Sequence, residues 1–212
     1  MSARPTTPAA AWTALREGNE RFVSGRMAHP SQDAYRRSEV ASAQFPFAVI
    51  FGCSDSRVAA EIIFDQGLGD VFVVRTAGHV IDTTVVGSIE YGVDVLGAAL
   101  VVVLGHDSCG AVAAANEALR TGVMPRGFVR AIVDRVIPSI VTGPTPEDDD
   151  GEVHIAEKSV ILREHIRSTV RTIEGYSVLL SDAIREGRCA IVGLEYTLVD
   201  GRVKVVEALG AV

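Results

Sequence analysis

The chain has 212 residues, of which 48% are hydrophobic and 22% charged, and its net charge is −7. This composition favours one compact domain over residues 1–212 and excludes extensive disorder, while the acidic balance excludes a protein that binds nucleic acid through phosphates. The longest apolar run, Val95 to Gly105, is too short to cross a bilayer, and the first residues have no apolar signal segment, so we expect a soluble, cytoplasmic protein without a membrane partner.

The first predicted element is an amphipathic helix over Pro8 to Val23, within an N-terminal helical arm of residues 1–24. Thr7 can cap this helix, and Pro8 suits its first position. Its large apolar side chains share one face, which we expect to pack on an apolar surface: Trp12, Leu15, Phe22 and Val23. No element is predicted in the polar stretch Ser24 to Gln44.

Three continuous apolar runs then predict buried strands: Phe47 to Phe51, Val71 to Val74 and Ala99 to Leu104. Continuous runs are typical of strands covered on both faces, as in parallel sheets. Helical spacing lies between them, over Glu61 to Phe64 and over Val85 to Leu96. The alternation predicts an α/β fold with a central, mostly parallel sheet flanked by helices.

The second half of the chain is predominantly helical before it ends in two strands. Helical spacing covers residues 111–120, 129–140, 155–173 and 178–185. The strands, Ala190 to Leu198 and Val203 to Ala208, are joined through Asp200-Gly201, which predicts a hairpin. Residues 142–152, with two prolines and an acidic run, are interpreted as a solvated acidic loop.

Two of the three cysteines and one histidine carry the chemical signal. An odd cysteine count in a chain with its own core favours metal binding or catalysis over disulfides. Cys53 directly follows the first predicted strand, and His106 and Cys109 follow the third. Because ligands bind at the carboxyl ends of strands in open α/β sheets, these side chains should converge. A Cys2His set with an open fourth position suits catalytic zinc.

The remaining candidates for metal ligands are interpreted as structural. Cys189 stands at the start of a predicted strand and has no candidate metal ligands near it in the sequence, so we expect it to be a buried core residue. The other histidines have no cysteine near them in the sequence, and none is assigned to the metal: His29, His79, His154 and His165.

The motif Cys53-x-Asp55-x-Arg57, followed by His106-x-x-Cys109-Gly110, resembles the zinc site of the β-class carbonic anhydrases. The sequence around the motif is similar to the sequences of bacterial members of that family. The resemblance implies that three residues bind one Zn²⁺ per subunit, namely Cys53, His106 and Cys109. It implies a catalytic dyad of Asp55 and Arg57, and the reversible hydration of carbon dioxide to bicarbonate and a proton by zinc-bound hydroxide.

The same resemblance implies four substrate-binding residues: Gln44, Phe72, Tyr91 and Gly110. In part of the family, a glutamine at the position of Gln44 reaches the substrate across a dimer interface. Family members that bind regulatory bicarbonate use a tryptophan, an arginine and a tyrosine. Arg75 and Tyr196 match the last two, but Ile50 replaces the tryptophan, which argues against that site. Gln44 and Ile50 place the chain nearer the plant-like subgroup, whose members usually have water on the zinc.

Asp55 and Arg57 also suggest a switch. The guanidinium of Arg57 can hold the carboxylate in two parallel hydrogen bonds and keep it away from the metal. If Arg57 releases it, Asp55 becomes a fourth zinc ligand in a closed state, which we expect low pH to favour.

Two alternatives to this function remain open. One is a non-catalytic zinc or thiol redox sensor that uses Cys53 and Cys109. The other is the same fold acting on CS2. A dinucleotide site is excluded because Phe72 stands where the third glycine of the fingerprint would fall, and a cysteine phosphatase is excluded by the short spacing from Cys53 to Arg57. The mean hydropathy of +0.26 favours self-association as a homodimer or homotetramer.

Overall fold

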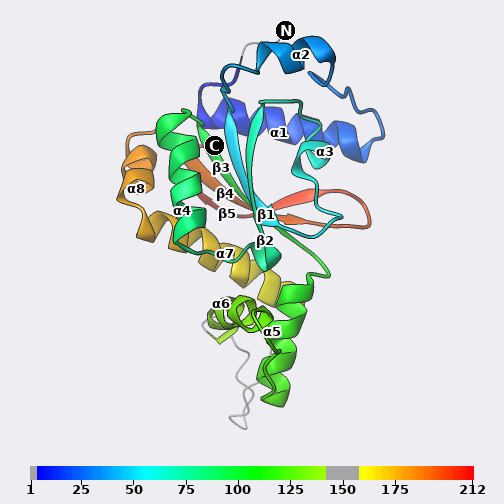
Figure 1. The fold of residues 1–212 in the computed structure, drawn as a ribbon, viewed down its shortest axis with the longest axis vertical. Coiled ribbons are helices and arrows are strands. Elements are labelled where there is room, and N and C mark those ends of the chain that lie inside the picture. The colour runs from blue at the N-terminus through cyan, green and yellow to red at the C-terminus, as the bar shows by residue number, and fades with distance from the viewer. Residues whose placement is uncertain (1–3, 142–157) are drawn as a thin grey trace.

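The computed structural model describes residues 4–141 and 158–212. Its centre is a five-stranded mixed sheet in the order β2-β1-β3-β4-β5 (Figure 1). The strands are β1 (Ala48–Cys53), β2 (Val71–Thr76), β3 (Leu100–His106), β4 (Ala190–Tyr196) and β5 (Val203–Leu209). The first four are parallel and β5 is antiparallel to β4. The predicted α/β fold with a mostly parallel sheet is confirmed.

Helices cover both faces of this sheet. On one face lie α1 (Pro8–Val23) and α3 (Ala60–Ile63), which pack against Ala48 and Ile50 of β1. The other face carries α4 (Thr83–Glu90), α5 (Gly110–Thr121), α6 (Val129–Val141), α7 (Lys158–Tyr176) and α8 (Val178–Arg185). These helices pack against Val49 and Phe51. Successive residues of β1 therefore enter opposite cores, which explains why its apolar run is continuous.

The helix α1 has the predicted bounds and cap. The Thr7 hydroxyl accepts a hydrogen bond from the Ala10 N–H at 3.3 Å, and Pro8 is the first helical residue. Ala11 and Leu15 are fully buried against the sheet, and Trp12 is partly buried beside them. The apolar surface on which the predicted arm packs is this chain's own sheet.

Two helical segments differ from the sequence predictions. The polar stretch contains α2 (Ala34–Glu39), capped by Asp33, and this helix buries no residue, so no apolar periodicity marks it. The helix predicted over Val85 to Leu96 is α4 followed by a π-helical turn, η2 (Tyr91–Val95). This turn brings Gly92 against β1, where a Cβ atom would lie 2.4 Å from Val49 Cγ2.

The C-terminal elements agree with the predictions within a few residues. The helix predicted over residues 155–173 is observed from Lys158 and continues to Tyr176. The predicted hairpin between β4 and β5 is confirmed, with Gly201 at φ +73° in its turn. Residues 155–157, the predicted acidic loop 142–152 and His154 lie outside the described residues. Within residues 4–141 and 158–212, no helix has both the length and the apolar character needed to cross a bilayer.

Candidate metal centre

The three predicted metal ligands come together at the carboxyl end of the sheet. Cys53 is the last residue of β1, His106 is the last of β3, and Cys109 immediately precedes α5. Their ligand atoms all lie within 4.8 Å of one another, and all three side chains are buried. Ser108 has φ +52°, a left-handed conformation that turns the chain sharply between β3 and α5.

The imidazole of His106 has one nitrogen available for a cation. Its Nδ1 lies 2.7 Å from the Asp107 carbonyl oxygen, which can only accept, so Nδ1 carries the proton. Its Nε2 is buried and has no hydrogen-bond partner among the residues that the structure describes. A backbone carbonyl on Nδ1 is the usual way in which proteins orient a histidine that binds a metal through its other nitrogen. Two thiols and this nitrogen fit the donor set of zinc.

The Cys53 sulfur is the most anionic atom of this group. The N–H groups of Gly78 and Asp55 point at Sγ from 3.3 and 3.4 Å. The pKa of Cys53 is lowered, chiefly because the Cys109 thiol donates a hydrogen bond to it, and the pKa of Cys109 is raised by the same contact. Burial lowers the pKa of His106, but the adjacent Cys53 thiolate outweighs it and the net change is upward. A divalent cation bound here would replace the protons of the thiols.

Asp55 and Arg57 form a pair beside the three ligands. Arg57 donates from Nε to Oδ1 at 2.9 Å and from Nη2 to Oδ2 at 2.8 Å, and its backbone N–H also reaches Oδ1. These bonds hold the pKa of Asp55 well below its usual range, so the carboxyl group is ionised. Its Oδ2 lies 3.9 Å from His106 Nε2. The structure therefore places an oriented carboxylate next to the unpartnered nitrogen.

Arg75 has a structural task that the sequence did not reveal. Its Nε donates to the Cys53 carbonyl at 3.0 Å, and its Nη2 donates to the Asp55 carbonyl at 2.7 Å. Ile50 is fully buried in the middle of β1, and Tyr196 is buried at the end of β4. The arginine that matches the regulatory bicarbonate site in the sequence is thus engaged in holding the loop after β1.

Comparisons with known proteins agree with this geometry. A sequence profile described as carbonic anhydrase matches residues 48–203, which include both metal-binding segments. Carbonic anhydrase 2 of Mycobacterium tuberculosis is 55% identical over 205 residues, covering 97% of this chain and 96% of that protein. The carbonic anhydrase of Mycolicibacterium smegmatis is 52% identical with the same coverage. The fold of the Coccomyxa β-carbonic anhydrase in complex with acetazolamide matches with a TM-score of 0.70 at 24% identity, covering 92% and 86% of the two chains.

The chain belongs to the β-class carbonic anhydrases.

For a carbonic anhydrase, three of the four predicted substrate residues lie away from the metal ligands of their own chain. Phe72 and Tyr91 contact each other, with ring centroids 6.1 Å apart, at the edge of the sheet formed by β2. Phe72 is four residues before Thr76, the partner of Cys53, which puts it about 13 Å along the strand from the metal ligands. Gln44 is exposed and precedes β1 at its far end. One chain brings Gly110 to its own metal ligands, at the start of α5, but not these three residues.

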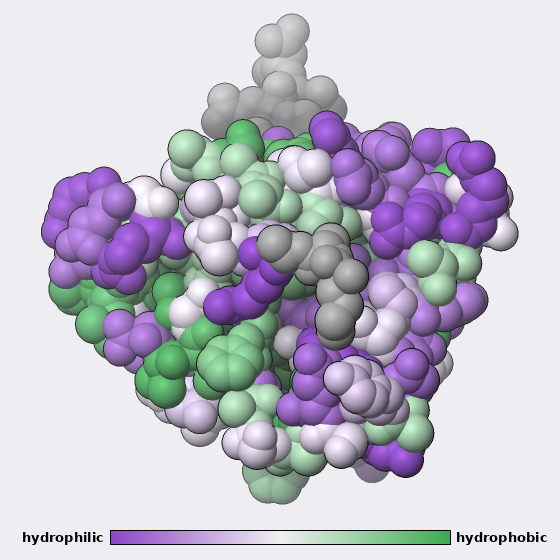
Figure 2. Space-filling view, turned by 90° about the horizontal axis from the view of Figure 1, so that it is seen from above, coloured by the Kyte–Doolittle hydropathy of each residue, from purple (hydrophilic) through white to green (hydrophobic). Residues whose placement is uncertain are grey.

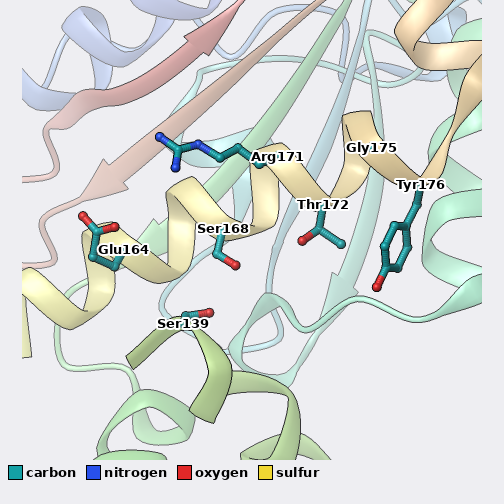
Figure 3. A pocket seen from close by; sticks show the side chains of 7 residues that line it. All are labelled: Ser139, Glu164, Ser168, Arg171, Thr172, Gly175 and Tyr176. Carbon is teal, nitrogen blue, oxygen red and sulfur yellow. The ribbon is translucent and has the colours of Figure 1, made fainter. Parts of the chain in front are cut away.

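Two hollows of the carbonic anhydrase chain contain none of the metal ligands. One, of about 450 Å³, lies between α6 and α7 (Figure 3), and its wall includes Ser139, Ser168 and Thr172. A wider groove of about 1070 Å³ runs along α1, α2 and the segment before β1, and includes Phe45. Figure 2 views the molecule from this end and shows apolar side chains gathered on part of it.

The remaining cysteine lies where the sequence predicted it, whereas two of the remaining histidines make a contact that the sequence did not predict. Cys189 is a core residue, as predicted, and burial raises the pKa of its thiol to about 12. His79 and His165 are also buried, with their ring centroids 4.3 Å apart. His165 is linked to the metal-binding loop through Gly78, which lies 87 positions away in the sequence. No local pattern could have revealed this contact.

Proposed function

We propose that the protein catalyses the zinc-dependent, reversible hydration of carbon dioxide to bicarbonate and a proton. The observation that carries this proposal is the buried Cys53, His106 and Cys109 set, with an unpartnered His106 nitrogen beside the ionised Asp55. Membership of the carbonic anhydrase family supports the reaction, and the donor chemistry supports zinc as the metal.

Each residue of the centre has a distinct task in this reaction. Cys53, His106 and Cys109 would hold the metal, and zinc bound there would acidify a water molecule to supply the hydroxide nucleophile. Asp55 is kept ionised by Arg57, so it can accept a hydrogen bond but not donate one. It would thus orient a protonated oxygen at the fourth position. Arg57 holds both carboxylate oxygens, and the proposed open state would need this arrangement.

We further propose that the substrate cleft is completed by a second copy of the chain. Gln44, Phe72 and Tyr91 lie too far from their own metal ligands to line the same cleft. They lie on an accessible part of the surface: Tyr91 is 46% exposed, and Phe45, next to Gln44, is 64% exposed. A homodimer in which each subunit offers this surface to its partner would complete two clefts by symmetry.

A stopped-flow hydration assay, with zinc quantified in the same sample, tests the proposal. We expect catalysis that scales with zinc content, is lost with a chelator and returns with zinc. Asp55→Ala should keep the zinc and lose most of the turnover. A zinc-loaded wild type without hydration activity would refute the proposal and favour the redox sensor. Assaying CS2 hydrolysis on the same samples identifies the other alternative, in which CS2 and not carbon dioxide is turned over.

A further inference from the structure

Gly78 connects the metal centre to the helices beneath it. Its N–H donates to Cys53 Sγ at 3.3 Å, and its carbonyl oxygen lies 2.8 Å from His165 Nε2. Its φ of +66° is left-handed, and a Cβ atom would lie 2.5 Å from Ala111 Cβ at the start of α5. Glycine is required here both for the conformation and for the close approach.

The hydrogen bonds around His165 have one consistent assignment. The Gly78 carbonyl can only accept, so His165 Nε2 carries a proton and donates. In a neutral ring Nδ1 is then an acceptor, and the Ser139 hydroxyl donates to it at 2.9 Å. Both side chains are almost fully buried, at 3% exposure each. His79 packs against the ring of His165 and restricts its plane.

This arrangement begins at the hollow between α6 and α7. Figure 3 shows Ser139 at its wall, on α6, next to the α7 side chains of Ser168 and Thr172. The hydroxyl of Ser139, the ring of His165 and the Gly78 residue form one connected path from this wall to the Cys53 sulfur. A buried chain of this kind, with every donor matched to an acceptor, holds its members in a single geometry.

We infer that Ser139 and His165 are positioning residues of the metal centre, which fix Gly78 so that its N–H remains on the Cys53 sulfur. This inference rests on the proposed metal site. Hydrogen bonds to a ligating sulfur withdraw electron density from it and tune the metal that it binds. Two thiolates would otherwise neutralise a dication, so an N–H on Cys53 keeps the metal a stronger Lewis acid. His165 acts through Gly78 and does not contact the ligands itself.

Cobalt(II) substitution provides a readout that needs no substrate. The charge-transfer band from thiolate to cobalt moves to longer wavelength when a sulfur loses a hydrogen bond. We would compare wild type with His165→Leu, which removes the donor to Gly78, and with His165→Gln, whose amide N–H can replace that donor. Ser139→Ala removes the bond that orients the ring. Thr169→Val is the matched control, because Thr169 is also a buried polar residue of α7.

We expect a longer-wavelength band in His165→Leu, a smaller shift in Ser139→Ala, and the wild-type band in His165→Gln and Thr169→Val. In the zinc form, kcat should fall by about 10-fold in His165→Leu and recover in His165→Gln. A wild-type band in metal-loaded His165→Leu would overturn the inference, as would an equal shift in Thr169→Val or no recovery in His165→Gln. If His165→Leu does not fold, an unchanged band in Ser139→Ala overturns it. A wild type that binds cobalt but hydrates no carbon dioxide would refute the proposed function and leave this comparison intact.

Discussion

The two ends of the sheet differ in how closely one chain brings its predicted site residues together. At the carboxyl ends of β1 and β3, the three ligand side chains are buried and within 4.8 Å of one another, and Asp55 is fixed by Arg57. At the opposite end, Gln44 is exposed, and Phe72 and Tyr91 contact each other at the edge of the sheet. A single chain therefore brings the three candidate metal ligands together and leaves Gln44, Phe72 and Tyr91 away from them. In the proposed homodimer, one chain would contribute parts to two different active sites.

The largest expected effect comes from breaking the metal end. Cys109→Ala removes one of three ligands and leaves Cys53 and His106, which are too few to hold zinc tightly. We expect the purified variant to contain little zinc and to hydrate carbon dioxide at the uncatalysed rate. Metal analysis and stopped-flow kinetics on one sample measure both quantities.

Cys189→Ala is the matched control for that variant, because it removes an equally buried thiol from the core of the same chain. It should keep one zinc per subunit and near-normal turnover. A full zinc equivalent in Cys109→Ala would show that the ligand set is wrong.

The next largest expected effect distinguishes zinc binding from catalytic turnover. Arg57→Ala removes both side-chain hydrogen bonds to Asp55 and leaves all three ligands in place. We expect full zinc content and a fall in kcat of about 100-fold, within the range for loss of a positioned acid–base group. Arg57→Lys should recover only part, because an ammonium group cannot bind both carboxylate oxygens in parallel. Wild-type turnover in Arg57→Ala would remove Asp55 orientation from the mechanism.

A mixed dimer tests the substrate end directly. One subunit carries Cys109→Ala and keeps an intact cleft surface, and the other carries Gln44→Ala with Tyr91→Ala and keeps its zinc. If each cleft is completed by the partner, the mixed dimer has one whole site, and we expect about half the wild-type activity per dimer. Two affinity tags and tandem purification isolate this species for the hydration assay.

The parent homodimers are the controls for the mixed dimer. Cys109→Ala alone should be inactive, and the cleft double variant should have at most about a tenth of wild-type activity, as expected when a substrate-positioning group is lost. A mixed dimer no more active than the average of these two would place the cleft within one chain and contradict the comparison.

The two ends also differ in how far the sequence predicted them. The buried strands and α1 were predictable because their apolar spacing is local, and the ligands because each follows a strand that the fold makes parallel. Family resemblance supplied Gln44, Phe72 and Tyr91, and it implied a place across a dimer interface for Gln44 but no place relative to the metal for Phe72 and Tyr91. That placement depends on how far each residue lies from the end of its strand. It is therefore set by the register of the whole sheet.

What escaped prediction has no local signature. The helix α2 buries nothing, so its sequence has no apolar stripe. The role of Arg75, which donates to the carbonyl groups of Cys53 at the end of β1 and of Asp55 in the following loop, depends on backbone atoms that every residue possesses. The path from His165 to Cys53 joins residues far apart in the chain through a glycine.

The smallest expected effect concerns acid stability, which we assign to the metal end. Burial and the neighbouring histidines lower the pKa of His79 well below its usual value, and burial also lowers the pKa of His165. At these two histidines the folded chain binds fewer protons than the unfolded chain, so their contribution to the free energy of unfolding rises with pH and is lost as pH falls below about 6.5. His79→Asn removes one such group, and asparagine tolerates the left-handed φ of +42°. We expect it to be less stable at pH 7.5, yet with a pH slope shallower by up to about 1.4 kcal/mol per unit.

Urea unfolding of the zinc-loaded protein between pH 5 and 7.5, followed by the fluorescence of Trp12, measures this slope. His29→Asn is the matched control, because His29 also has a left-handed φ, of +46°, but is exposed at the other end of the molecule. Because zinc release also depends on pH, the slopes of the three proteins are compared at equal zinc content. If His79→Asn keeps the wild-type slope, or if His29→Asn flattens it as much, the buried histidines beside the metal centre are not the source of acid sensitivity.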